Sequence, residues 1–402
     1  MERINLNKLK KNSNYNKVDS VYYKYFTFIH QIFLKAIGLS PWTIDTSGIC
    51  KNQRLKNHNF ECYFSRAGSC YNVLLFITYI CFGIFIVLNI SSTKIDSRPI
   101  LDAVAVKLSF IATLCISLIP LIYIFQQKLI ISVNRRFKNV DQKLNKCADY
   151  KMANDNTNYF IFTINLAITS CLIIMREIYY MSVEIVFAIS IPYFISSWVI
   201  IQYAILINML KKRFKSINMT ISKLGTMESK IPLSRYSVLN DISSIKYAYV
   251  ELCEMCDDAT DFYGLPLLIV IIMFAIRTLL NLYYIIIALI DKQKIDTGEY
   301  LSGLFILGSI FLFITLTTVV TQLIKQNRKT ARMVNSLMDR YSMDDKIVKK
   351  LSKFSNDLWH LTVEFTACGI IPLDRTLLAV ITGTIATYLV IAVQFRVSSP
   401  SN

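Results

Sequence analysis

The chain has 402 residues, of which 54% are apolar and only 18% are charged, and its formal net charge is +17. A soluble protein of this length carries about 25% charged residues, so the composition excludes an ordinary soluble enzyme and a disordered chain. The Lys and Arg residues fill the segments between long apolar runs, which argues for membrane topology signals and against nucleic-acid binding. The sequence therefore predicts an all-α integral membrane protein.

The first seventy residues contain no apolar core of a cleavable signal peptide. Residues 22–39 form a short aromatic stretch that His30 and Lys35 interrupt. This stretch is too short and too polar for a membrane span. It predicts an interfacial or re-entrant helix.

Seven apolar runs follow, each close to the length of about 20 residues that crosses a hydrocarbon core of about 30 Å. The third run is the shortest because Arg176 and Glu177 end it. The predicted membrane spans are residues 71–90, 101–125, 159–175, 183–207, 262–290, 301–324 and 376–395.

The distribution of cationic residues predicts the orientation of these spans. The segments on one side hold 36 Lys and Arg residues, and those on the other side hold 5. Cationic residues gather on the cytoplasmic side of membrane proteins. We therefore expect a cytoplasmic N-terminus and an extracellular C-terminus.

Other membrane-protein and enzyme classes fit less well. G-protein-coupled receptors have the opposite orientation, and many transporters show two comparable halves, which this chain lacks. The chain carries none of the common nucleotide-binding, hydrolase or metalloprotease motifs. Cys253-x-x-Cys256 is a lone pair of cysteines without a second pair at metal-binding spacing. We expect no enzymatic activity, cofactor or metal site; a coupled receptor or a transporter remains a less favoured alternative.

The last predicted span carries polar and aromatic residues at helical spacing. The members of this stripe are Thr384, Thr387, Tyr388, Ile391, Gln394 and Phe395. They recur at three- and four-residue intervals and share one face of a helix, while Leu389, Val390, Ala392 and Val393 face elsewhere. Such a face serves either to pack helices together or to line a pore.

The same span resembles the last helix of insect gustatory receptors. Thr387-Tyr388, five apolar residues and Gln394-Phe395 match the signature of that family, and residues 365–378 are similar to its approach to the last helix. The resemblance implies the insect chemoreceptor ion-channel fold. It also implies a tetrameric, ligand-gated, non-selective cation channel in the plasma membrane, opened by a small-molecule tastant. The tetramer would be homomeric or formed with other gustatory receptors.

One departure from the family pattern limits the classes of ligand that we expect. Leu389 follows the Thr-Tyr pair, where the main sugar-receptor branch typically has Glu. The residue argues against that branch and leaves bitter-type and fructose-type receptors open. An insect odorant receptor subunit is the alternative with the same helical plan.

The resemblance and the predicted spans together divide the chain into five regions. Residues 1–70 are a cytoplasmic segment with the interfacial helix, and residues 71–325 hold six spans with the ligand pocket and cytoplasmic loops. Residues 326–375 are a cytoplasmic anchor, residues 376–396 the pore-lining helix, and residues 397–402 an extracellular tail.

Charged residues inside membrane spans are costly and therefore candidates for function. The strongest is Arg277 in the fifth span, with Asn281 one turn further along the same face. We predict a ligand pocket lined by Arg277, Asn281, Tyr283, Trp198 and Tyr193. A structural ion pair of Arg277 with Glu184 is the alternative, and Lys107 and Arg176 are expected to extend toward lipid headgroups.

Overall fold

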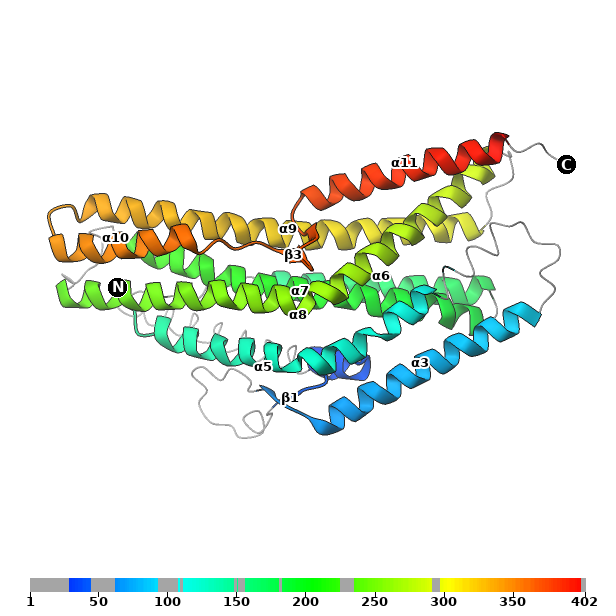
Figure 1. The fold of residues 1–402 in the computed structure, drawn as a ribbon, viewed down its shortest axis with the longest axis horizontal. Helices are drawn as coiled ribbons and strands as arrows, with labels where there is room; N and C mark the ends of the chain where they lie inside the picture. Colours follow the sequence, from blue (N-terminus) through cyan, green and yellow to red (C-terminus); the bar gives the residue numbers. More distant parts are fainter. Residues whose placement is uncertain are drawn as a thin grey trace, which may run out of the picture.

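The computed structural model describes residues 29–44, 62–92, 108, 111–147, 150, 156–180, 183–224, 235–290 and 297–398. Within these residues, seven helices are long and apolar enough to cross a membrane. Figure 1 shows them running side by side along the long axis of the molecule. The predicted helical membrane protein with seven spans is confirmed.

Almost all of the described chain is helical, because in lipid a helix satisfies its own backbone hydrogen bonds. The named helices are α3 (Arg66–Ser92), α5 (Ile119–Leu144), α6 (Thr157–Tyr180), α7 (Val183–Leu224), α8 (Arg235–Ile290), α9 (Thr297–Arg340), α10 (Asp345–His360) and α11 (Thr376–Ser398). Shorter helical segments cover residues 29–36 and 111–117.

One predicted boundary differs from the structure. The third span was expected to end before Arg176, but α6 continues to Tyr180 because Arg176 packs against aromatic rings inside the bundle. Between the fourth and fifth predicted spans, residues 211–224 and 235–261 are helical extensions of α7 and α8. Residues 101–107 of the second predicted span, Lys107 included, lie outside the described residues.

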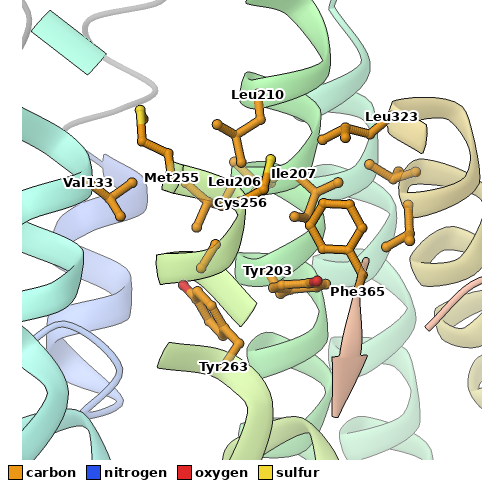
Figure 2. Packing of buried hydrophobic residues seen from close by; sticks show 14 of the residues in the cluster. Val133, Tyr203, Leu206, Ile207, Leu210, Met255, Cys256, Tyr263, Leu323 and Phe365 are labelled. Carbon is orange, nitrogen blue, oxygen red and sulfur yellow. The ribbon is translucent and has the colours of Figure 1, made fainter. Parts of the chain in front are cut away.

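Helix α7 forms the centre of the bundle. It packs against α6, α8 and α9 and also touches α3. Figure 2 shows its side chains Tyr203, Leu206 and Leu210 meeting residues of α8 and α9 in a continuous apolar core. The core continues past the membrane span into the long extensions of these helices, where α10 packs on α8 and α9.

The segment predicted as an interfacial or re-entrant helix is inserted into the bundle at residues 29–36; residues 22–28 lie outside the described chain. Leu34 and Leu39 are fully buried. Gln202 Nε2 of α7 donates to Leu39 O at 3.0 Å, and Asn72 Nδ2 of α3 donates to Gly38 O at 2.7 Å. The segment is therefore anchored by the spans themselves.

Two small antiparallel hairpins connect the helices. Strand β1 (Thr43–Ile44) pairs with β2 (Cys62–Tyr63) before α3, and β3 (Thr366–Ala367) pairs with β4 (Ile371–Pro372) before α11. The second hairpin lies against Gly264 of α8, where an added Cβ would come within 3.2 Å of Cys368 N. This close approach fixes the start of α11 on the bundle.

Candidate functional site

Three aromatic rings from three helices meet inside the bundle. The ring centroids of Tyr193 on α7 and Phe274 on α8 are 5.5 Å apart, and Phe305 on α9 lies 5.0 Å from Tyr193 and 6.1 Å from Phe274. All three side chains are buried. They lie near the start of α7 and α9, in the predicted outer half of the membrane. We call these three rings the aromatic box.

An arginine lies against this box. The guanidinium of Arg176, near the end of α6, is 5.9 Å from the ring centre of Tyr193 and 5.7 Å from that of Phe305. The side chain is buried, and a cation over an aromatic face offsets part of the cost of leaving water. Arg176 therefore belongs to the interior of the bundle and does not reach toward headgroups as its sequence position suggested.

A second arginine joins the site from α8. Arg277 follows Phe274 by three residues and lies within electrostatic range of Arg176. Its Nη2 atom has no solvent-accessible surface. Two guanidinium groups thus contribute positive charge beside the aromatic box. The side chain of Glu184, the predicted ion-pair partner, lies outside the described residues.

Buried hydroxyl groups complete the site. Tyr193 Oη, Ser190 Oγ and Thr278 Oγ1 are enclosed, and within the described residues none of them has a hydrogen-bond partner. A Cβ added to Gly308 of α9 would lie 2.6 Å from Tyr193 Oη, so only glycine admits the tyrosine at this position. Buried hydroxyl groups without partners are costly, and a ligand with polar groups could satisfy them.

The predicted pocket residues do not all share this site. Tyr193 and Arg277 lie at the aromatic box, and Asn281 is one turn further along α8, with its Nδ2 donating to Arg277 O at 2.8 Å. Tyr283 is buried beside Tyr284, with ring centroids 6.0 Å apart. Sequence reasoning missed Phe274 and Phe305. Phe274 could have been found, because it precedes Arg277 by three residues and so lies on the same face of the helix.

Trp198 lies in a second aromatic cluster. Its ring is 4.4 Å from Phe33 and 4.9 Å from Phe162, centroid to centroid, so it contacts the N-terminal helix and α6. His30 lies at the edge of this cluster, and burial lowers its pKa to about 4. The cluster holds residues 29–36 in place and contains a neutral histidine at physiological pH.

Metal ligands do not gather in the described part of the chain. No group of three His, Cys, Asp or Glu residues there has metal-binding geometry. Cys253 and Cys256 are free thiols buried on α8, next to the apolar core shown in Figure 2. These two cysteines pack as small apolar side chains.

Helix α11 lies along the edge of the bundle in Figure 1, in contact with α8 and α9. It touches its own chain through a single apolar face, on which Leu377 and Ile385 are buried. The predicted stripe is on the other side of the helix, and all six of its residues are exposed: Thr384, Thr387, Tyr388, Ile391, Gln394 and Phe395. The exposed side of the stripe is therefore accessible to a partner outside this chain.

Comparison with known proteins assigns the family. A family model described as 7tm chemosensory receptor matches residues 28–399. The chain belongs to the 7tm chemosensory receptor family. It is consequently a multi-pass membrane receptor.

Several relatives of this chemosensory receptor are known in Drosophila melanogaster. The proteins named gustatory receptor 28b and gustatory receptor 28a are each 29% identical to it, over 203 and 178 residues. The gustatory receptor for sugar taste 43a is 28% identical over 186 residues. These alignments cover 48%, 41% and 45% of this chain and 42%, 39% and 42% of the relatives. The chain thus spans less than half of the length of the relatives that it matches.

A solved structure shares the fold of this chemosensory receptor. The insect olfactory receptor OR5 from Machilis hrabei superposes with a TM-score of 0.68, covering 94% of this chain and 100% of OR5 at 13% identity. The same receptor in complex with eugenol gives a TM-score of 0.59. At this identity the likeness concerns the fold alone.

Proposed function

We propose that the protein is a gustatory receptor of the plasma membrane that acts as a ligand-gated, non-selective cation channel, built from four subunits and opened by a small tastant. The observation that carries this proposal is the exposed stripe of α11. Tyr388 and Phe395 are 58% and 73% exposed on a helix that is apolar enough to span a membrane.

The chemistry of the stripe favours a pore over a lipid contact. The hydroxyl of Thr387 is satisfied by Gly383 O at 2.9 Å, but the Gln394 amide and the Tyr388 hydroxyl lie on the exposed face. Polar groups that face lipid are costly, whereas a water-filled pore solvates them. Four such helices around an axis would put Gln394 and Phe395 near the predicted extracellular end of the pore, where we propose that they form the gate.

The remaining regions then take the roles expected for such a channel. The aromatic box with Arg176 and Arg277 is the ligand pocket, within residues 71–325. The long extensions of α7, α8 and α9, with α10, supply the cytoplasmic anchor at which subunits meet. Residues 376–396 line the pore.

The ligand class follows from the relatives and from one residue. Relatives include a receptor named for sugar taste, and Leu389 argues against the main sugar branch. Bitter-type and fructose-type ligands therefore remain the two candidates. The similarity to OR5 is equally compatible with an odorant receptor subunit, because it concerns the fold. The relatives found by sequence are gustatory receptors, and they favour the gustatory assignment.

Excised membrane patches test the proposal. Cells that express this chain alone are screened with sugars and bitter compounds, and patches from responding cells are perfused with the agonist without nucleotides. A current that persists supports a channel. A current that disappears on excision and returns with nucleotides would show a coupled receptor.

A further inference from the structure

An exposed group of aromatic and cationic side chains lies where α3 begins. Tyr63 and Phe64 just before α3 are 50% and 54% exposed, and Phe125 of α5 is 82% exposed. The cationic side chains Arg66, Lys128 and Arg135 are exposed as well. We call these six residues the interfacial patch.

Two side-chain contacts bring the parts of the patch to the same level of the bundle. Gln127 Nε2 donates to Ser69 Oγ at 3.2 Å, which places Lys128 beside the first turn of α3. Asn134 Nδ2 donates to Cys62 Sγ at 3.1 Å, which places Arg135 beside β2. Figure 1 shows β1, the start of α3 and the middle of α5 along one edge of the molecule.

The spacing along α5 gives the patch an apolar and a charged side. Phe125, Lys128 and Arg135 are separated by three and seven residues and therefore share one face of the helix. Going along this face, the aromatic ring comes first, on the side of the apolar span, and the cations follow. Aromatic rings beside cations are typical of the membrane–water interface.

The patch itself contains three cations and no carboxylate. Helix α3 has no acidic residue, and the single carboxylate of α5, Asp141, is held by Arg213 at 2.7 Å. Arg136 lies near Phe125 around α5, and its guanidinium pairs with Glu254 at 2.7 Å, with Asp258 and Glu251 of α8 also within 4 Å. Within the described residues, no carboxylate forms an ion pair with these three cations, and their charge is available to an external anion.

We propose that the interfacial patch binds the headgroup of an anionic phospholipid of the cytoplasmic leaflet. Charge complementarity selects this occupant, because that leaflet carries anionic lipids and Lys and Arg near its surface attract them. Arg66, Lys128 and Arg135 contact the phosphate and the acidic headgroup, while Tyr63, Phe64 and Phe125 lie at the top of the acyl chains. The assignment to this leaflet uses the orientation that the cationic loops predict.

Binding of phosphatidylserine to the purified full-length protein tests the proposal. Fluorescent phosphatidylserine and phosphatidylcholine are titrated into the detergent-solubilised chain. The triple variant Arg66→Gln, Lys128→Gln, Arg135→Gln is compared with Lys346→Gln, Lys349→Gln, Lys353→Gln on α10, which removes the same charge from exposed positions beyond the membrane.

We expect the patch variant to bind phosphatidylserine about tenfold to a hundredfold more weakly, with phosphatidylcholine binding unchanged and the α10 variant like the parent. Equal losses in both variants would mean that only overall charge attracts the lipid, and unchanged binding in the patch variant would also overturn the proposal. Should the triple variant not fold, Arg66→Lys with Arg135→Lys, which keeps the charge, must retain binding, and Lys128→Gln alone must weaken it.

Discussion

Individual residues of the candidate ligand site are held by contacts between helices that only the fold brings together. Arg176 and Arg277 were both recognisable in the sequence as charges within membrane spans. Their aromatic neighbour Phe305 was not, because a phenylalanine in a membrane span is unremarkable until its direction is known. Tyr193 was a predicted pocket residue, and the structure puts its ring between those of Phe274 and Phe305 in the aromatic box.

Arg277 is expected to contribute directly to ligand affinity. Replacing it with Ala removes a charged hydrogen-bonding group worth about 1.5–3 kcal/mol, so half-maximal activation should need about tenfold to a hundredfold more ligand. Dose–response curves together with surface biotinylation measure this. If the variant does not reach the cell surface, Arg277 is a structural residue and not a ligand contact.

Gly308 is expected to control the position of Tyr193. The Gly308→Ala side chain would lie 2.6 Å from Tyr193 Oη and push the ring out of the box, whereas Gly303 on the same helix has open space around it. Overpacking costs about 1–3 kcal/mol, so we expect about a tenfold loss of ligand sensitivity for Gly308→Ala. Gly303→Ala should leave the ligand sensitivity unchanged.

A second substitution sharpens this prediction. Adding Tyr193→Phe removes the clashing hydroxyl and should restore part of the sensitivity of Gly308→Ala. Dose–response curves of the double variant, compared with those of Gly308→Ala, measure this recovery. No recovery would show that the alanine acts on something other than Tyr193.

At the level of helices, the sequence predicted the number and type of elements but not how they meet. Long apolar runs suffice to predict seven spans. The burial of residues 29–36 and the helical continuation through Arg176 depend on partners from distant helices, such as Phe162 and Tyr193. The stripe on α11 was predictable because it depends on the period of one helix alone.

The contact between α5 and α7 should be sensitive to the loss of either charge in one ion pair. Arg213 and Asp141 form two hydrogen bonds of 2.7 and 2.9 Å, and the arginine side chain is 4% exposed. Removing one partner of such a buried pair costs about 3–5 kcal/mol, so Arg213→Met should clearly lower the thermal unfolding temperature.

A matched variant on α5 provides the control. Arg136 pairs with Glu254 across α5 and α8, but Glu254 is half exposed. Such a pair contributes about 0–1 kcal/mol, so Arg136→Met should change the unfolding temperature little. The unfolding temperatures are measured on the detergent-solubilised proteins. An equal decrease in Arg213→Met and Arg136→Met would contradict a special role for the buried pair.

For the molecule as a whole, the charge distribution and the fold lead to one arrangement in the membrane. The long helical extensions and most cationic residues lie at one end, and α11 ends at the other, as Figure 1 shows for the helices. The positive-inside rule then predicts that the extensions lie in the cytoplasm. This orientation underlies both the proposed gate at Phe395 and the proposed lipid site.

Epitope tags test the orientation. In intact cells, an antibody should reach a C-terminal tag and should reach an N-terminal tag only after permeabilisation, since 36 cationic residues lie on one side and 5 on the other. Immunofluorescence of the two tagged proteins measures this. Surface labelling of the N-terminal tag would reverse the arrangement.

Ion flux through the purified protein tests the central claim, that the α11 stripe lines a pore. Four copies of Phe395 would form a hydrophobic constriction, and Phe395→Ala should widen it and let cations through without ligand. Val390, 56% exposed but off the stripe, is the matched control. In liposomes, we predict cation flux for Phe395→Ala and closed channels for Val390→Ala and the parent. Equal flux for the two variants, or none for Phe395→Ala, would contradict the account.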